Sequence, residues 1–244
     1  MTAIAIMGAT GTIGSALAHR LAGQGQSLLL VGRNPDKLAS LSALLRQPSI
    51  AVDFSRSEAL EEALRSGSEP LGGLSGLVNC IGSVLLKPAH GTSDDDFRTI
   101  LEVNLFTAFA AVRAGAKLMR QQGGSIVLFA SAAAEVGVPN HEAIAAAKAG
   151  VIGLARSAAA TYAANNIRVN VISPGLVRTE MTRRLWETPA SAAASSQMHA
   201  LGRLGEPRHV ASLAAWLVDG ENDWITGQVL GVDGGLGHVL SRRQ

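Results

Sequence analysis

A glycine-rich turn between the first apolar stretch and the first helical stretch constrains the fold more than any other feature. Residues 3–7 read AIAIM, and Gly8, Gly11 and Gly14 follow before a helical pattern begins. Glycines permit a tight turn and a close approach of the backbone to a ligand, and the following helix presents N–H groups and a positive dipole to phosphates. The stretch therefore predicts a site for the diphosphate of a dinucleotide.

Six further short apolar runs alternate with longer helical patterns. They lie at residues 27–31, 49–52, 74–80, 125–130, 167–172 and 228–232. Each run is continuously apolar rather than alternating, as expected for strands of a parallel sheet that is covered on both faces. The alternation of strand and helix predicts an α/β fold, with a doubly wound parallel sheet of about seven strands in a single domain over residues 1–244.

Local signals mark where two helices begin. Asn34 is a good N-cap with Pro35 at the first helical position, and Thr92 or Ser93 precedes three aspartates at 94–96 that suit the positive end of a helix. This interpretation of the aspartates is favoured over a metal site. By contrast, residues 180–206 show no clear period, which is typical of a lid, a binding loop or a disordered segment.

Composition argues against several classes of protein. The formal charge is +2, and no run of lysine and arginine is interleaved with aromatic residues, which argues against nucleic acid as a partner. The hydrophobic residues, 47% of the chain, fall in runs shorter than the about 18 residues of a membrane span. A single cysteine, Cys80, permits no internal disulfide, and the first residues enter a strand with no targeting segment. We expect a cytoplasmic protein that contacts no membrane and binds no metal.

The end of the second predicted strand bears on which dinucleotide binds. An acidic residue there would bind the ribose hydroxyls of the adenosine, but the run reads LLLVGRN and ends on Gly32 and Arg33. The planar guanidinium of an arginine suits a 2′-phosphate, so Arg33 favours NADP over NAD. The alternative is a solvated arginine just before a helix cap.

Spaced motifs over essentially the whole chain resemble those of the short-chain dehydrogenase/reductase family, which has a Rossmann fold. In the family's order they are the glycine loop at 8–14, VDF at 52–54, VNCIG at 78–82, VNL at 103–105, GGSIVLFAS at 123–131, Lys148, IRVNVISPG at 167–175, Thr179 and VDGG at 232–235. The resemblance implies a nicotinamide cofactor and a small-molecule substrate. So many ordered matches are specific for the family, although not for a substrate.

The resemblance also implies roles for individual residues. Ser131 would hydrogen-bond the substrate carbonyl, Lys148 would hold the nicotinamide ribose, and Asn104 would be the family's structural, water-binding asparagine. The residues expected at the cofactor, from its diphosphate and adenine to its nicotinamide end, are Gly8, Thr10, Gly11, Thr12, Ile13, Gly14, Arg33, Asp53, Phe54, Asn79, Ile81, Gly82, Lys148, Pro174, Gly175, Val177 and Thr179.

Two positions depart from the family pattern. Thr12 stands where the commonest loop has a glycine, although Gly11, as in some branches, should still allow phosphate binding. The family's proton donor is a tyrosine four residues before the lysine, and that position is Ile144, which can neither give nor take a proton. General acid catalysis is typically worth about 10²–10⁴-fold in rate, so its loss is serious without being absolute.

Other side chains are possible replacements for the tyrosine. The only tyrosine, Tyr162, lies eighteen residues beyond that position on the same predicted helix, about 27 Å away, so it cannot serve within one subunit. His141 is the best replacement, because it shares a helical face with positions 144 and 148. With Asn140 as the expected N-cap, however, His141 would lie in the first turn, where the helix dipole disfavours imidazolium. Weaker alternatives are His90, Glu135 and Glu142.

Three functions remain open. The chain could reduce a carbonyl with another donor, either His141 or Ser131 with water. It could reduce a conjugated C=C bond, as do branches of the family that lack the tyrosine, or it could bind NADP as an inactive sensor or interaction protein. The retained Ser131, Asn104 and Lys148 favour an oxidoreductase. The alanine-rich stretch 143–164 would let helices approach closely, which suits the homodimers and homotetramers of the family.

Overall fold

Seven parallel strands form one sheet in the computed structural model, which describes residues 2–239. They are β1 (Ala3–Met7), β2 (Leu28–Gly32), β3 (Ser49–Ala51), β4 (Leu74–Asn79), β5 (Gly124–Phe129), β6 (Ile167–Pro174) and β7 (Val229–Val232). Their order is β3-β2-β1-β4-β5-β6-β7. Each predicted strand is present with bounds that differ by at most two residues, so the doubly wound sheet is confirmed.

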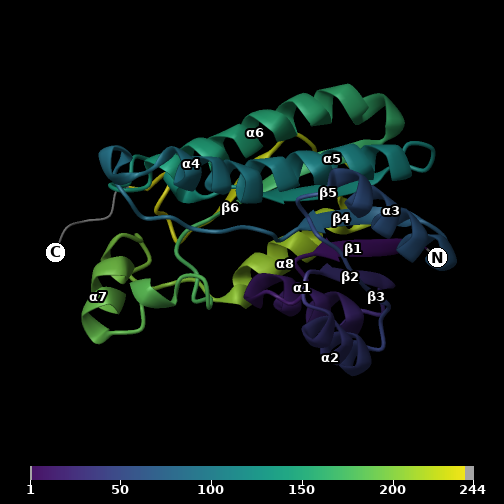
Figure 1. Cartoon of the computed structure of the whole chain (residues 1–244), viewed down its shortest axis with the longest axis horizontal. Coiled ribbons are helices and arrows are strands. Elements are labelled where there is room, and N and C mark those ends of the chain that lie inside the picture. The colour runs from purple at the N-terminus through teal and green to yellow at the C-terminus, as the bar shows by residue number, and fades with distance from the viewer. Residues whose placement is uncertain (1, 240–244) are drawn as a thin grey trace.

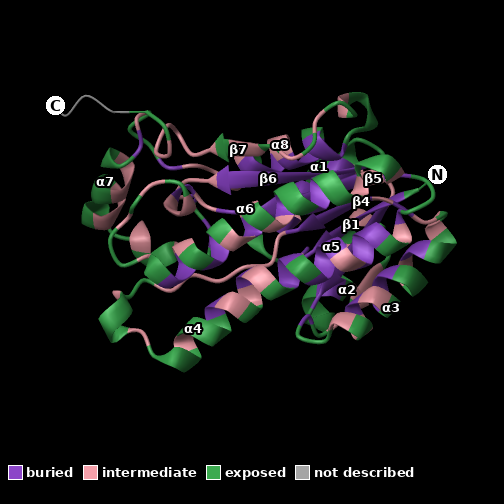
Figure 2. Ribbon diagram, turned by 90° about the horizontal axis from the view of Figure 1, so that it is seen from above, coloured by how far each residue is buried: buried purple, intermediate pink, exposed green. Residues whose placement is uncertain are grey.

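Helices cover both faces of the sheet (Figure 1). One face carries α1 (Thr12–Gly23), α2 (Pro35–Leu45) and α8 (Pro207–Val218). The other face carries α3 (Ser57–Ser68), α4 (Asp94–Leu101), α5 (Thr107–Leu118) and α6 (Glu142–Tyr162). Figure 2 shows the strands buried between these layers, and all five residues of β1 and of β2 are buried. Burial on both faces is the reason why these strands read as continuous apolar runs.

The predicted helix starts are confirmed at α2 and α4. The Asn34 side chain accepts a hydrogen bond of 2.9 Å from the Lys37 N–H, with Pro35 at the first position. Ser93 accepts one of 3.1 Å from the Asp96 N–H, and the three aspartates occupy the first turn of α4.

The 180–206 segment lies beyond the carboxyl end of the sheet and is more regular than expected (Figure 1). It contains a 3-10 turn at Arg183–Leu185 and the helix α7 (Pro189–Gln197), which the Thr188 side chain caps. No residue of α7 is buried. Its residues are small or polar, so its sequence carries no apolar stripe by which the helix could have been predicted.

Two helical runs, Asp94–Leu118 and Glu142–Asn165, are long and apolar enough to cross a membrane by length and composition alone. Of their most apolar windows, 56% and 44% of the residues are buried within the protein. Both runs lie against the sheet, and core helices of globular proteins meet the same criteria, so this observation is weak evidence for a membrane.

Candidate active site

The glycine loop between β1 and α1 is packed too tightly to admit a side chain at Gly8 or Gly14. Gly8 has a φ of +75°, and a Cβ at Gly14 would lie 2.3 Å from the Gly8 carbonyl oxygen. Helix α1 starts after Gly11, which provides no side-chain cap, and its first turn holds no acidic residue. The first N–H groups of α1 therefore face the carboxyl end of the sheet without a local anion, as the binding of a diphosphate requires.

A cavity of about 670 Å³ opens at this end of the sheet, between the glycine loop and the 180–206 segment. It brings together most of the residues that the sequence singled out. Those that line it are Thr10, Gly11, Thr12, Ile13, Gly14, Ile81, Gly82, Asn104, Ser131, His141, Lys148, Pro174, Gly175, Val177 and Thr179. Most of them follow the carboxyl ends of β1, β4, β5 and β6, which is where ligands bind in open α/β sheets, whereas Asn104, His141 and Lys148 come from helical segments.

Three predicted cofactor residues, Gly8, Asn79 and Phe54, are not part of the cavity lining. Gly8 underlies the loop, and the buried Asn79 side chain accepts a hydrogen bond of 3.2 Å from the Ile81 N–H, so it shapes the wall at Ile81. Phe54 is buried in the core. Its ring therefore supports the fold of the VDF motif instead of offering a surface to a ligand.

Arg33 and Asp53 are both exposed, outside the cavity lining. The Asp53 carboxylate accepts a hydrogen bond of 3.0 Å from the Ser55 N–H. Hydrogen bonds from Ser55 lower the pKa of Asp53, and the positive charges of Arg33 and Arg56 lower it further. The side chains of Arg33 and Asp53 thus lie near one another past the ends of β2 and β3.

Lys148 projects from α6 into a buried position. Its Nζ donates a hydrogen bond of 2.9 Å to the Phe129 carbonyl, and the residue is 7% exposed. Burial lowers the pKa of Lys148 from 10.5 to about 8. Ser131 lies two residues after β5, where its hydroxyl caps a 3-10 turn by accepting a hydrogen bond of 3.2 Å from the Ala133 N–H. Both polar groups are fixed by backbone contacts at the cavity.

Asn104 lies in a π-helical turn, Glu102–Phe106, that joins α4 to α5. Its Nδ2 donates to the Ile100 carbonyl and to the Ser83 hydroxyl, each at 3.0 Å, and its Oδ1 accepts from the Ser83 N–H at 3.1 Å. π-turns are rare and frequently occur at functional sites. Here the turn aims Asn104 at the β4 loop beside Lys148, and a Cβ at Gly82 would lie within 3.6 Å of both side chains.

Ile144 is the residue that the sequence predicts in the position of the family tyrosine. It is 5% exposed and packs against Ile100, Ala143 and Ala147 between α4 and α6, while its side chain also lines the cavity. Ser131, Ile144 and Lys148 therefore line one cavity, where Ile144 presents a hydrocarbon side chain beside the two polar residues.

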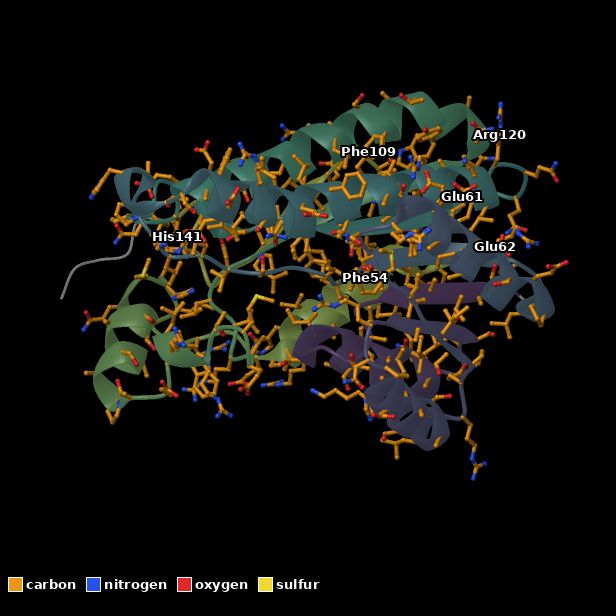
Figure 3. The ribbon with its side chains drawn as sticks, in the orientation of Figure 1. Phe54, Glu61, Glu62, Phe109, Arg120 and His141 are labelled. Carbon is orange, nitrogen blue, oxygen red and sulfur yellow. The ribbon has the colours of Figure 1, made fainter. Side chains whose placement is uncertain are left out.

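His141 lies at the mouth of the cavity, between α6 and α7 (Figure 3). The prediction for its local structure was wrong by one residue: His141 is itself the N-cap of α6, and Asn140 takes a left-handed φ of 62° before it. Asparagine tolerates this conformation better than other non-glycine residues, which lets the chain turn into the helix there. The Nδ1 of His141 lies 2.8 Å from the Pro139 carbonyl, which can only accept, so Nδ1 carries the proton. No residue within 2–239 is hydrogen-bonded to Nε2.

The other potential proton donors do not reach the cavity lining. His90 is exposed in a 3-10 turn, Glu142 is exposed, and Tyr162 lies at the far end of α6. Glu135 accepts a hydrogen bond from the Ser173 hydroxyl, and its other oxygen lies 3.5 Å from the His238 ring. Within residues 2–239, no cluster of His, Cys, Asp and Glu could hold a metal ion.

Among the cavity residues that were not identified from the sequence, three bear on the site through their polar side chains. Lys37 lines the cavity from α2, one helical turn after Arg33, and that spacing of two basic residues could have identified it. Ser83 contacts Asn104, and His199 is a buried polar residue of the cavity wall. No sequence pattern distinguishes these last two from ordinary polar positions.

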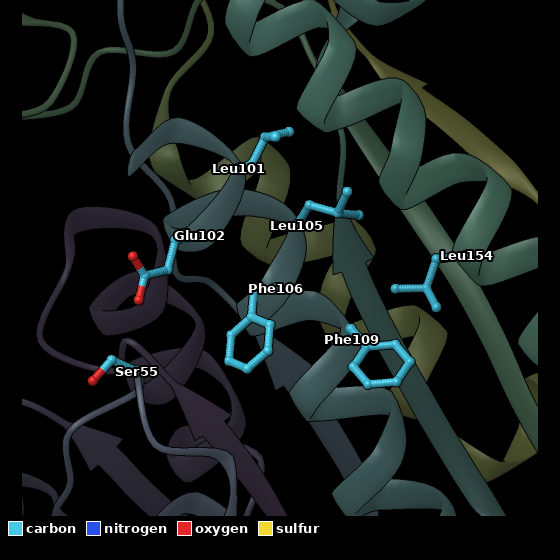
Figure 4. Close-up of a pocket in the computed structure, with 7 residues that line it drawn as sticks. All are labelled: Ser55, Leu101, Glu102, Leu105, Phe106, Phe109 and Leu154. Carbon is cyan, nitrogen blue, oxygen red and sulfur yellow. The ribbon is translucent and has the colours of Figure 1, made fainter. Parts of the chain in front are cut away.

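A second cavity of about 580 Å³ lies outside the active site, on the surface of α4, α5 and α6 (Figure 4). Its lining is mostly apolar and includes Leu105, Phe106, Phe109 and Leu154. Phe109 is 47% exposed, with the Arg113 guanidinium 5.9 Å from its ring centre. An exposed aromatic group of this kind is unusual for a helix face that meets only water.

Comparisons with known proteins agree over nearly the full length of the chain. A family model described as Enoyl-(Acyl carrier protein) reductase matches residues 8–237. Carbonyl reductase family member 4 of Xenopus laevis is 33% identical over 238 residues, which are 95% of this chain and 96% of that protein. The 3-oxoacyl-(acyl-carrier-protein) reductase of Mus musculus is 34% identical over 238 residues, with the same coverage of both chains, 95% and 96%.

Solved structures have the same architecture. A short-chain type dehydrogenase/reductase from Mycobacterium ulcerans superposes with a TM-score of 0.93 at 28% identity, covering 98% of this chain and 91% of that one. The structure of ElxO with NADP bound superposes with a TM-score of 0.91 at 25% identity, covering 97% and 99%. The chain therefore belongs to the short-chain dehydrogenase/reductase family of oxidoreductases.

Proposed function

We propose that the protein is an NADP-dependent reductase that transfers hydride to a small carbonyl or conjugated acceptor and uses a proton donor other than tyrosine. The observation that carries this proposal is a single cavity lined by the glycine loop, Ser131, Lys148 and Asn104, with Ile144 in the tyrosine position. A Cβ at Gly14 would fill the space beneath the loop, so the loop fits the close approach of a diphosphate.

Basic side chains at the adenosine end support NADP as the cofactor. Arg33 follows β2 and is exposed, and Lys37 lines the cavity one turn later. The strand ends without the acidic residue that binds ribose hydroxyls in NAD-binding sites. The structurally similar protein ElxO has been solved with NADP bound.

His141 is the side chain best placed to replace the tyrosine. The nicotinamide supplies the hydride when bound, and the acceptor oxygen then needs a proton. With Nδ1–H held by the Pro139 carbonyl, Nε2 of His141 is the nitrogen that can carry a second proton at the cavity and release it. Ser131 would donate a hydrogen bond to the acceptor oxygen, and the Lys148 ammonium would hold the nicotinamide ribose.

Ile144 also supports a second candidate function, that of an inactive NADP-binding sensor or interaction protein. A hydrocarbon in the tyrosine position is compatible with cofactor binding and incompatible with the family's usual proton transfer. Reduction of a conjugated C=C bond remains compatible with Ile144, because hydride attack on that bond gives an enolate that groups other than a tyrosine can stabilise.

Consumption of NADPH with a panel of ketones, quinones and enoyl compounds tests the proposal. We would compare the wild type with His141→Ala, with His90→Ala as the matched control of an exposed histidine, and with Ile144→Tyr. Turnover by the wild type that falls about 100-fold in His141→Ala, and not in the control, supports His141 as the donor. Turnover unaffected by His141→Ala refutes that role, and turnover only by Ile144→Tyr favours the inactive binder.

Three further features of the protein are part of the proposal. The 180–206 segment acts as a lid over the acceptor, because Met181, Leu185 and Met198 line the cavity from it. The chain forms a homodimer or homotetramer through the second cavity on α4, α5 and α6, where exposed aromatic side chains would be covered. The protein works in the cytoplasm, on a small molecule and without nucleic acid or membrane.

A further inference from the structure

His199 lies in the cavity wall, packed between the end of β6 and the turn after β7. It follows α7 at the end of the 180–206 segment and is 3% exposed. A Cβ at Gly175 would lie 2.8 Å from its Nε2, and a Cβ at Gly234 would lie 3.4 Å from its Cβ. The ring is therefore packed against the end of β6 on one side and against the turn after β7 on the other.

Both ring nitrogens of His199 are bonded to backbone groups. Nε2 lies 3.0 Å from the backbone nitrogen of Leu176, and Nδ1 lies 2.9 Å from the Ser195 carbonyl oxygen. A backbone N–H can only donate and a carbonyl can only accept, so Nε2 is the acceptor and Nδ1 carries the proton. In this arrangement the ring is neutral and its tautomer is fixed. Its one N–H is donated to the Ser195 carbonyl, so the ring has no proton to give to a substrate.

The backbone of Leu176 is held from both sides. Its N–H donates to His199, and its carbonyl accepts a hydrogen bond of 2.9 Å from the Gly205 N–H. The next residue, Val177, forms a parallel bridge with Gly205. Leu176 lies within the Pro174–Val177 segment, which lines the cavity directly after β6. His199 thus supplies the side-chain acceptor that fixes the path of this segment.

We propose that His199 is a positioning residue for the nicotinamide. Its neutral Nε2 fixes the Leu176 N–H and so the Pro174–Val177 segment, against which the nicotinamide binds. The inference rests on the proposed function, because it requires a nicotinamide dinucleotide in the cavity. The diphosphate and adenosine ends meet other elements, the glycine loop and the start of α2, so the effect of His199 is confined to the nicotinamide half.

Substitutions that differ only in reach separate this role from a loss of packing. Glutamine can place an amide oxygen near the position of Nε2, whereas asparagine reaches only as far as Nδ1. His199→Gln should therefore keep the bond to Leu176, and His199→Asn should lose it. His199→Leu removes both bonds. His209→Leu is the matched control, because His209 also accepts a backbone N–H, that of Glu206 at 2.9 Å, yet it does not line the cavity.

The readout is the dissociation constant of NADPH and of 2′,5′-ADP, a ligand that keeps the 2′-phosphate and lacks the nicotinamide. We expect His199→Asn and His199→Leu to weaken NADPH about tenfold and to leave 2′,5′-ADP unchanged. His199→Gln and His209→Leu should bind both ligands like the wild type. Thermal unfolding checks that each variant folds. If His199→Leu does not fold, the comparison of His199→Gln with His199→Asn still decides the question.

Three results overturn the inference: normal NADPH affinity in His199→Asn, equal weakening of both ligands, or a glutamine variant as impaired as the asparagine variant. Wild-type protein that binds neither NADPH nor 2′,5′-ADP refutes the proposed function itself, and the inference with it. This outcome can be told apart from the other three, because it is measured on the wild-type protein alone.

Discussion

Replacing Lys148 by methionine should stabilise the protein at neutral pH while weakening its binding of NADPH. Lys148 is 7% exposed, and within residues 2–239 no carboxylate forms an ion pair with it. Burial lowers its pKa from 10.5 to about 8, which corresponds to about 3 kcal/mol of unfavourable free energy for the charged form in the folded state. Methionine has a similar length and carries no charge. Loss of the hydrogen bond to the Phe129 carbonyl offsets about 1 kcal/mol, so we expect a net gain of about 2 kcal/mol at pH 7.

The sign of the pH dependence follows from which state binds the proton. Below pH 8, Lys148 is protonated in both the folded and the unfolded state. Between about 8 and 10.5 the unfolded chain binds more proton than the folded one, so the free energy of unfolding of the wild type rises with pH by about 3 kcal/mol. Methionine cannot titrate, and the advantage of the variant therefore disappears over this range. Burial raises the pKa of Cys80 from 9.0 to about 12, which gives the opposite slope at alkaline pH in both proteins and cancels in the difference.

Urea unfolding followed by tryptophan fluorescence at a series of pH values measures this difference. We expect Lys148→Met to be more stable than the wild type by about 2 kcal/mol at pH 7 and less stable by about 1 kcal/mol at pH 10.5. Lys117→Met is the control, because Lys117 is exposed and pairs with Glu61 at 2.7 Å. A difference that stays constant across the pH range refutes the reasoning, since no buried charge would then be titrating.

Four other substitutions or reagents test particular contacts. Gly14→Ala places a Cβ 2.3 Å from the Gly8 carbonyl oxygen, so fluorescence titration should show NADPH binding lost, and normal binding would mean that the loop opens easily. Arg33→Ala should weaken NADPH about tenfold and leave NADH unchanged, whereas equal losses would place Arg33 away from the 2′-phosphate. Cys80 is half-buried at the cavity, and burial raises the pKa of its thiol to about 12, so at pH 8 Ellman's reagent should label it far more slowly in the folded than in the unfolded protein; equal rates would contradict this. Phe109→Asp should yield monomers in light scattering, and an unchanged mass excludes the α4–α6 surface as an interface.

The fold was predictable because its determinants are local. Strands such as β1 and β2 are buried on both faces, so their apolar character is continuous and visible in a short window. Asn34 and Ser93 cap helices through their own side chains, within three residues of the N–H groups that they bind. Such contacts do not depend on the rest of the chain.

The site was predictable only where spacing along one element or one motif determined it. Lys148 and Ile144 share α6, and their relation to Ser131 follows from the order of the family motifs. His199 meets Leu176 from 23 residues away, and its role depends on how the 180–206 segment returns to the sheet. The start of α6 was misplaced because a left-handed Asn140 turns the chain one residue before the helix, a conformation that asparagine permits and does not require.

The π-helical turn at Glu102–Phe106 limits how this part of the chain can change in length. A π-helical turn contains more residues than an α-helical turn. Here the extra residue brings the Asn104 amide to both Ile100 and Ser83. Deleting one residue between Ile100 and Asn104 would restore a regular helix and rotate the amide by about 100°, away from the loop after β4. Insertions and deletions in front of Asn104 should therefore be selected against among relatives.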